Sequence, residues 1–514
     1  MSDLSILGKD AVMDSRLSRT YRLWSGFAIY MLLMSGVLFL AFSHWGYDDP
    51  YITYRYAENI RLGRGFVYNP GEQVLSTTTP LFALILSGLS NPWIPLPHLA
   101  ILLSSVSMAF SGIFLWDLGR SWKLPWVAWS GLLLFPTFPL VLSTTGSETP
   151  LYLALCLGAF AAYTRRRISV AALFSALAVL TRPDGILVPA LLAGHYCLTG
   201  MGFFGTGGRL GFGGVNRKHT QEFMAQIPWS SIVLFFAIIV PWFVFSWVYF
   251  GSLVPVTLTA KQAQGEMAIS QRFLPGMLTI IRWYSGWPYK LEAFLGLLGL
   301  SILFRSARPA VLFLTWAVLY FVAYSFLGVS RYFWYYAPLV PGFIVAAGLG
   351  ISFVGRDWWR RPGLASIAPK YLAAGLLALL LFGQVGTLMR TRENSDNRLS
   401  IYRATGEWLA ANTASGDTVG AFEVGIIGYY AKRPMVDFAG LIQPEVARQF
   451  NIHTTYEDSA LWALEKYQPR YVALQEGLFP AVERAFLSEN CLPVETISKE
   501  HHPYPYNMVI FACQ

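Results

Sequence analysis

The chain has few charged residues for its length. Asp, Glu, Lys and Arg together make up 13% of its 514 residues, whereas 54% are hydrophobic and 16% are aromatic. A soluble protein of this length rarely contains so little charge, and several apolar runs approach the roughly 20 residues that cross a bilayer. The composition therefore predicts a polytopic α-helical membrane protein.

Other features are also missing. The formal net charge is +9, but no basic face with interleaved aromatic residues is evident, so no nucleic-acid partner is expected. No motif indicates a nucleotide and no ligand spacing indicates a metal, so no cofactor is predicted. Residues 1–22 are polar and basic, and the apolar run after them lacks a small-residue cleavage site. That run is predicted to remain as the first membrane helix.

Cysteine is scarce, and the four cysteines do not suggest a metal site. Cys156 and Cys197 fall within apolar runs, where cysteine usually serves in packing. Cys491 and Cys513 flank two strand-like segments near the C-terminus. A disulfide between these two and a pair of free thiols are both compatible with the sequence.

Hydropathy predicts about eleven membrane spans. The predicted spans cover residues 23–42, 97–118, 125–143, 150–164, 168–181, 185–200, 228–250, 289–304, 309–327, 335–354 and 371–389. The run Leu81–Leu89 is too short to cross a bilayer and predicts a re-entrant or interfacial helix.

Basic residues concentrate in alternate connections between these spans, as is typical of cytoplasmic loops. These residues are Arg120, Lys123, Arg165, Arg166, Arg167, Arg209, Arg217, Lys218, Arg305, Arg308, Arg356, Arg360, Arg361 and Lys370. The chain is therefore predicted to be a multi-pass plasma-membrane protein with a cytoplasmic segment 1–22. Its first loop, residues 43–96, is predicted to lie outside the cytoplasm.

The composition changes after residue 389, where a polar linker leads into alternating helical and strand patterns. Helices are predicted at 401–413 and 425–433, and strands at 417–425, 433–439, 469–475 and 506–512. An odd number of spans places this part outside the cytoplasm. The chain thus divides into a membrane domain, residues 23–389, and a small extracytoplasmic α/β domain, residues 390–514.

Charged residues gather at the predicted outer ends of the spans. The cations there are Arg182, Lys261, Arg272 and Arg331. The carboxylates there are Asp48, Asp49, Glu58, Glu72, Glu148 and Asp184. Both kinds at one membrane depth suit a lipid-linked phosphate substrate, because cations hold a phosphate and a carboxylate deprotonates an acceptor hydroxyl.

Each acidic residue of this set also has a structural interpretation. Asp48 and Asp49 precede a helix expected near Tyr51, and Glu148 precedes one near Pro150, so all three are at positions where side chains cap helices. A divalent ion between the three carboxylates is a further alternative. Three basic residues of the same loop are predicted to form a solvated or headgroup-facing edge: Arg55, Arg61 and Arg64.

The outer cations have structural interpretations as well. Arg182 can form an ion pair with Asp184 or Glu148. Lys261 and Arg331 can extend to lipid headgroups while their stems stay in apolar surroundings.

The first loop resembles a family motif. DDPYITYRYAENIRLGRGFVYNPGE, residues 48–72, is similar to the DDxxITxRYxxNLxxGxGxVxNPGE loop of the GT-C superfamily of polyprenyl-phosphate-dependent glycosyltransferases. The strongest resemblance is to the mycobacterial cell-wall arabinofuranosyltransferases and their relatives of unassigned substrate. Further resembling segments are TTGSETPLY, LTRPDG, YFGSLVPVTLTAK, RYFWYYAPLVPG and GAFEVGIIGYYAKRPMVDFAGL.

The resemblance implies roles for individual residues. The general base is one of Asp48 and Asp49, with a slight preference for Asp48. The implied contacts to the donor phosphate are Lys261, Arg331 and Arg182. The implied sugar or acceptor pocket contains Glu148, Tyr54 and Thr79. The sequence departs from the family at Thr79-Pro80, where the family tends to have His-Pro, and at Val256, where it has Asn.

The resemblance also implies a reaction: inverting transfer of a sugar, for example a pentose such as arabinofuranose, from a polyprenyl-phosphate donor. The acceptor is a hydroxyl of a cell-envelope glycan, a lipid or a protein. A lipid-linked sugar transporter or flippase is an alternative, although it predicts charges inside helices and repeated halves. A non-catalytic glycan-assembly protein on the same scaffold is another.

Overall fold

The computed structural model describes residues 3–201, 227–356, 368–393 and 396–514. Five of the predicted cytoplasmic cations lie outside these residues: Arg209, Arg217, Lys218, Arg360 and Arg361.

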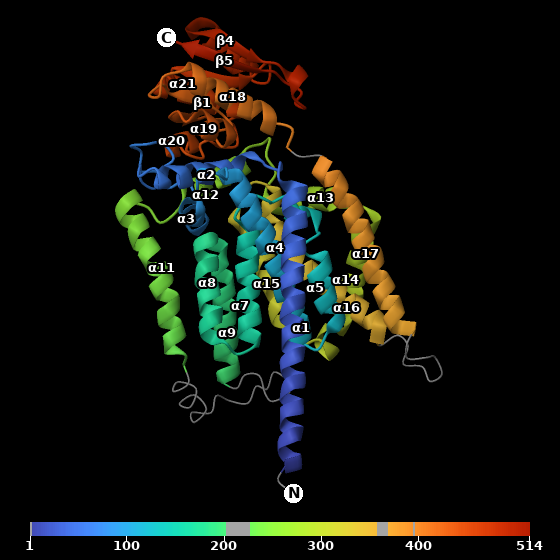
Figure 1. The fold of residues 1–514 in the computed structure, drawn as a ribbon. Coiled ribbons are helices and arrows are strands. Elements are labelled where there is room, and N and C mark those ends of the chain that lie inside the picture. The colour runs from blue at the N-terminus through green and yellow to red at the C-terminus, as the bar shows by residue number, and fades with distance from the viewer. Residues whose placement is uncertain (1–2, 202–226, 357–367, 394–395) are drawn as a thin grey trace.

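Apolar helices form a bundle beneath a small mixed domain (Figure 1). The helices of the bundle are α1 (Asp3–Phe42), α4 (Leu96–Ser121), α5 (Pro125–Leu134), α6 (Pro139–Leu142), α7 (Thr149–Thr164), α8 (Ile168–Thr181), α9 (Leu187–Gly200), α11 (Trp229–Phe250), α14 (Trp287–Ser306), α15 (Pro309–Leu327), α16 (Val340–Arg356) and α17 (Ala368–Glu393). The N-terminus lies at one end of the bundle, and the C-terminal domain covers the other end.

The predicted polytopic helical fold is confirmed. Seven of the described helices are long and apolar enough to cross a membrane: α1, α4, α11, α14, α15, α17, and α16 together with the short turns before it. Four other predicted spans, at 125–143, 150–164, 168–181 and 185–200, correspond to shorter helices. The total of about eleven spans therefore stays a prediction.

Close helix contacts in the bundle depend on small residues. Gly299 of α14 and Gly350 of α16 lie where those helices cross, and a Cβ on Gly350 would come within 1.9 Å of the Leu295 carbonyl oxygen. Small residues allow such backbone contact in membrane helices, where lipid provides no hydrophobic drive for association. Elsewhere in the bundle, Glu292 of α14 is fully buried and accepts a hydrogen bond from Gln384 of α17.

Short elements form a layer between the bundle and the C-terminal domain. They are α2 (Asp48–Arg61), α3 (Pro80–Leu89), η1 (Pro183–Ile186), α12 (Val256–Glu266), α13 (Phe273–Trp283), η2 (Phe333–Tyr335) and η3 (Ala337–Leu339). The helix predicted at Leu81–Leu89 is thus present as α3. Gly251 and Gly328 end α11 and α15 with φ of 67° and 76°, where glycine is favoured, and turn the chain into this layer.

The C-terminal domain has one five-stranded sheet. Its elements are α18 (Leu399–Asn412), β1 (Val419–Ala421), α19 (Ile426–Ala431), β2 (Met435–Asp437), α20 (Pro444–Ala447), α21 (Tyr456–Tyr467), β3 (Tyr471–Gln475), α22 (Pro480–Val482), η4 (Glu483–Leu487), α23 (Ser488–Asn490), β4 (Cys491–Ile497), η5 (Lys499–His501) and β5 (Met508–Cys513). The strand order is β2-β1-β3-β5-β4, with β1 parallel to β2 and β3, and β5 antiparallel to β3 and β4. The predicted α/β character is confirmed.

The two C-terminal cysteines form a disulfide. Cys491 begins β4 and Cys513 ends β5, so the cysteines lie within the paired strands and face each other across the ladder. The sequence left a disulfide and free thiols open, and strand register decides between them because it places the residues opposite each other.

Candidate functional site

A cavity of about 340 Å³ lies where the bundle meets the overlying layer. Its walls come from α2, the segment before α3, the loop before α7, η1, α12, the end of α15 and η2. Among the described residues, its lining comes entirely from segments that precede the C-terminal domain. Charged and hydroxyl side chains share this cavity with the apolar residues Ile186, Leu187, Leu258 and Leu327.

The adjacent aspartates of α2 point in different directions. Asp49 lines the cavity. Asp48 is 6% exposed, and its carboxylate accepts hydrogen bonds from the backbone N–H of Gly425 and Ile426 at 3.0 and 2.7 Å. Neither aspartate caps α2, whose N-cap position is Tyr47 and has no side-chain cap. Of the two predicted base candidates, Asp49 alone faces the cavity.

Burial raises the pKa of Asp48 well above its ordinary value, and the negative charge of Glu423 raises it further. The hydrogen bond from Ile426 and the charge of Arg398 act in the opposite direction. Asp48 therefore gains a proton more readily than an exposed aspartate.

Lys261 of α12 pairs with Asp49 inside the cavity. The ammonium donates a hydrogen bond to Oδ2 of Asp49, and the Lys261 side chain is 8% exposed. The ammonium also lies 4.9 Å from the ring centroids of both Tyr332 and Trp334. Burial lowers the pKa of Lys261, but the charge of Asp49, the nearby Tyr335, the hydrogen bond to Asp49 and the charge of Glu148 all raise it, and the net pKa is raised. Lys261 therefore stays cationic although its side chain is buried.

Arg182 anchors the opposite corner. Its side chain is 5% exposed, and it forms ion pairs with Glu148 at 3.2 Å and Asp184 at 3.1 Å. It also donates hydrogen bonds to the hydroxyls of Thr149 and Tyr324 at 3.3 and 2.9 Å. A guanidinium has five N–H donors, and these contacts occupy all of them. The structural interpretation of Arg182 as a bridge is confirmed.

The loop before α7 positions Glu148 in this corner. Ser104 accepts a hydrogen bond from the Gly146 N–H at 3.0 Å and donates one to the Ser147 carbonyl at 3.3 Å. Gly146 has φ of 91°, which favours glycine. Glu148 occupies the N-cap position of α7 without making a side-chain cap, so its carboxylate is available to Arg182.

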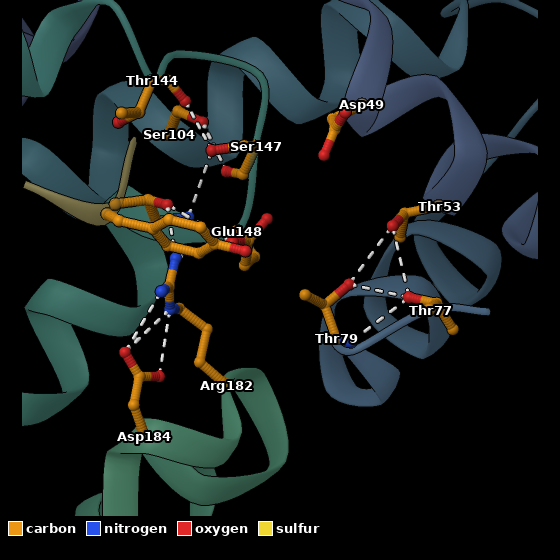
Figure 2. Close-up of polar contacts among 12 residues, drawn as sticks. Asp49, Thr53, Thr77, Thr79, Ser104, Thr144, Ser147, Glu148, Arg182 and Asp184 are labelled. Carbon is orange, nitrogen blue, oxygen red and sulfur yellow. Dashed lines mark hydrogen bonds and ion pairs between the residues drawn. The ribbon is translucent and has the colours of Figure 1, made fainter. Parts of the chain in front are cut away.

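Hydroxyl side chains line the wall opposite Arg182 (Figure 2). Thr53, Thr77 and Thr79 form a triangle of mutual hydrogen bonds at 3.1–3.3 Å. Ser76 and Thr257 are also buried and line the cavity, yet within the described part of the chain neither hydroxyl has a hydrogen-bond partner. Unpartnered buried hydroxyls at a cavity wall can bind a polar ligand. Sequence reasoning selected Thr79 but missed Ser76 and Thr257, because only the fold shows which hydroxyls lack partners.

Two other predicted site residues lie outside the cavity lining. The Arg331 guanidinium lies 5.3 Å from the Trp283 ring centroid, and Arg331 is absent from the cavity lining. The Tyr54 hydroxyl donates to the Gly146 carbonyl at 2.5 Å and so supports the loop that carries Glu148.

One prediction for the first loop is wrong. Arg61 and Arg64 are exposed as expected, but Arg55 is 5% exposed and donates hydrogen bonds to backbone carbonyls of Tyr68, Gly428 and Arg433. A helix pattern on its own did not reveal that a second domain covers this face of α2.

The geometry does not favour the divalent ion considered between Asp48, Asp49 and Glu148, because both oxygens of Asp48 bind backbone N–H groups away from the cavity. Among the described residues, no group of three His, Cys, Asp or Glu side chains is placed to hold a metal ion.

Comparisons with known proteins show the fold. Residues 390–509 match a family model described as a domain of unknown function (DUF8728), and no curated protein matches the chain in sequence. ArnT from Cupriavidus metallidurans, solved bound to undecaprenyl phosphate, superposes with a TM-score of 0.59 at 15% identity, covering 95% of this chain and 98% of ArnT. The archaeal oligosaccharyltransferase AglB from Archaeoglobus fulgidus, solved with an inhibitory peptide and a dolichol-phosphate, gives 0.55 at 16% identity over 88% of this chain and 69% of AglB. The chain therefore has the fold of the GT-C membrane glycosyltransferases.

Proposed function

We propose that the protein transfers a sugar from a polyprenyl-phosphate donor to a hydroxyl of a glycan, lipid or protein acceptor at the outer face of the membrane. The observation that carries this proposal is the Asp49–Lys261 pair inside the cavity. It combines a proton acceptor with a phosphate-binding cation in a fold whose solved neighbours include one bound to undecaprenyl phosphate.

Asp49 is the proposed general base. The acceptor hydroxyl gives its proton to the Asp49 carboxylate, and the acceptor oxygen attacks the anomeric carbon from the face opposite the phosphate. The bond between that carbon and the phosphate oxygen breaks, and polyprenyl phosphate leaves with the electron pair. Because phosphate is a good leaving group, one carboxylate is sufficient for this inverting displacement. The orientation of the side chains supports Asp49 over Asp48, the residue that the family resemblance favoured.

Lys261 is the proposed main contact to the donor phosphate. An ammonium has three N–H donors, and Asp49 is the acceptor of one of them. The ammonium has further N–H donors for phosphate oxygens, so Asp49 and the donor phosphate can share Lys261. The hydroxyls of Ser76 and Thr257 supply further donors.

The Arg182 corner suits the sugar better than the phosphate. One guanidinium and two carboxylates give it a formal charge of −1, and every Arg182 donor is occupied. An anionic phosphate is disfavoured there, whereas the oxygens of Glu148 and Asp184 can accept hydrogen bonds from sugar hydroxyls. We therefore assign Arg182 to orient these carboxylates.

Charge and disulfide chemistry support an outer location for the site. The cavity is lined by the end of α15 and the start of α9, whereas Arg165–Arg167 and Arg305–Arg308 lie in turns at the opposite ends of the helices. Basic turns are typical of the cytoplasmic side. The Cys491–Cys513 disulfide belongs to the domain on the cavity side, and disulfides persist in oxidising compartments.

The test uses the full chain in lipid nanodiscs. Decaprenyl-phosphate arabinofuranose and decaprenyl-phosphate mannose are supplied in parallel, and release of decaprenyl phosphate is measured, because it reports transfer to any acceptor, including water. We expect release from one donor and its loss in Asp49→Asn. Movement of either donor across a liposome bilayer without release would instead establish the transporter alternative.

A further inference from the structure

Helix α2 lines the cavity and also makes direct contacts with the C-terminal domain. The Asp48 carboxylate accepts hydrogen bonds from the backbone N–H of Gly425, the N-cap residue of α19, and of Ile426, its first residue. Asp48 therefore caps a helix that lies 377 positions further along the chain.

Arg55 lies seven residues further along α2 and binds the same part of the domain. Its buried guanidinium donates to the Tyr68 carbonyl at 2.9 Å and to the carbonyls of Gly428 and Arg433. One of these acceptors belongs to the first loop and two belong to the C-terminal domain. A planar fork of donors of this kind restricts both the position and the rotation of the helix that carries it.

The loop after α2 extends this attachment. The Tyr68 hydroxyl donates to the Val424 carbonyl at 2.6 Å, and the Asn69 amide exchanges two hydrogen bonds of 2.9 Å with the backbone of Met435. The contact is close enough to require glycine, since a Cβ on Gly428 would lie 1.9 Å from the Tyr68 hydroxyl oxygen.

Helix α2 also shares a hydrophobic core with the domain. Tyr51, Tyr54 and Ala57 belong to the same buried cluster as Ile426 and Ile427 of α19. The rings of Tyr51 and Tyr429 meet edge to face at 5.5 Å. Helix α2 therefore packs in one buried cluster with the C-terminal domain and with α3 and α4 of the bundle side.

We infer that the C-terminal domain is a positioning domain for the catalytic helix, and that Asp48 is the positioning residue through which it sets the direction of Asp49. The inference rests on the proposed function of Asp49. Neighbouring residues on an α-helix are separated by about 100° of rotation, so an Asp48 side chain held on α19 leaves Asp49 directed toward Lys261. The domain does this without contributing a described residue to the cavity lining.

The first test compares two substitutions of Asp48 in the full chain. Asp48→Ala removes both acceptor oxygens. Asp48→Asn keeps one acceptor oxygen on a side chain of nearly the same shape. A positioning role predicts that decaprenyl phosphate release falls about tenfold or more in Asp48→Ala and recovers in part in Asp48→Asn, with undecaprenyl phosphate affinity unchanged in both. If Asp48 were itself the general base, decaprenyl phosphate release would be lost equally in the two variants, and this result would overturn the inference.

The second test restores the attachment covalently. The Glu58 and Lys432 side chains form an ion pair at 3.4 Å between α2 and the domain, so a Glu58→Cys, Lys432→Cys pair can be joined by a short bifunctional thiol reagent. Cys197, an exposed free cysteine, is first replaced by Ser. We expect the crosslink to restore turnover to Asp48→Ala but not to Asp49→Asn. A crosslinked Arg403→Cys, Glu407→Cys pair within α18 controls for the reagent. No rescue of Asp48→Ala would contradict the inference.

A third measurement does not depend on activity. Hydrogen exchange of peptides covering 48–61 and 425–433 should rise together in Asp48→Ala and return to wild-type values on crosslinking. If exchange is unchanged, the positioning role fails whatever the enzyme does. If exchange changes as expected but wild-type protein releases no decaprenyl phosphate, the proposed function fails and the attachment stands.

Discussion

The ammonium of Lys261 donates a hydrogen bond to the carboxylate of Asp49, which lies 212 residues earlier in the chain. The pair joins α12 to α2 and places the carboxylate and the cation of the proposed transfer side by side in the cavity. It also means that each charge is compensated before any substrate binds.

Replacing Asp49 by Asn is expected to remove the proton acceptor and to keep the shape of the side chain. Loss of a general base typically lowers the rate about 10²–10⁴-fold. The rate of decaprenyl phosphate release should therefore fall by at least about 10², while undecaprenyl phosphate binds as tightly as before or more tightly, because Lys261 loses its competing partner.

The matched control for this substitution is Glu407→Gln, which neutralises a carboxylate that is paired with Arg403 and about half exposed. It should leave turnover within twofold of wild type, because exposed pairs contribute little. Wild-type turnover in Asp49→Asn would show that the proton goes elsewhere.

Replacing Lys261 by Met is expected to weaken undecaprenyl phosphate binding by about tenfold or more, since a charge-assisted hydrogen bond contributes about 1.5–3 kcal/mol. Arg331→Gln should change this affinity by less than twofold, because that guanidinium lies over Trp283 outside the cavity. Titration of both nanodisc-embedded variants with undecaprenyl phosphate distinguishes them. Equal losses would assign phosphate binding to both cations, as the family resemblance implied.

Ser76→Ala and Thr257→Val are expected to weaken undecaprenyl phosphate binding without lowering the stability of the protein. Neither hydroxyl has a partner within the described residues, so its removal should leave the thermal unfolding temperature unchanged or slightly higher. If these hydroxyls bind the donor, each substitution should weaken undecaprenyl phosphate binding by about threefold to tenfold. Thr137→Val is a useful contrast, because Thr137 already binds Gln384 at 2.9 Å and should lose stability without losing affinity. Unchanged affinity in both cavity variants would show that the Ser76 and Thr257 hydroxyls do not bind the donor phosphate.

Arg182→Gln is expected to destabilise the protein strongly. The substitution leaves Glu148 and Asp184 as two nearly buried carboxylates without their shared cation, a change that typically costs about 3–5 kcal/mol. Thermal unfolding in detergent should therefore shift to lower temperature. Adding Asp184→Asn to the same chain should recover part of the loss, because it removes one uncompensated charge. A double variant less stable than Arg182→Gln would show that the corner is not held by charge balance.

The local pattern of the sequence was sufficient to predict the helical bundle, the short helix α3 and the α/β character of the C-terminal domain, because these depend on periodicity and length. It also identified the corner of Arg182, Glu148 and Asp184 as possible ion-pair partners. Both successes concern residues whose interactions follow from a nearby helix end or a shared membrane depth.

The sequence did not predict which aspartate faces the cavity. That choice depends on α19, a helix far along the chain, where the backbone N–H groups of Gly425 and Ile426 donate hydrogen bonds to Asp48. Arg55 was misassigned for the same reason, since its three acceptors are backbone carbonyls that no side-chain pattern reveals. Long-range contacts to backbone atoms leave no motif in a single sequence.

The C-terminal domain should lose stability as pH rises from 4 to 7. Burial raises the pKa of Asp437 from 3.8 to about 7, although hydrogen bonds from Ile442 and Ala439 oppose the shift and Glu423 adds to it. The folded state therefore keeps a proton that the unfolded state releases in this range, so the stabilisation is complete below about pH 4 and is lost as pH approaches 7. The free energy of unfolding that this proton contributes changes by about 4 kcal/mol over this pH range. Hydrogen exchange of β1 and β2, corrected for intrinsic rates, should show protection that falls between pH 5 and 7. Asp437→Asn should flatten this dependence, and an equal slope in both proteins would assign it to another group.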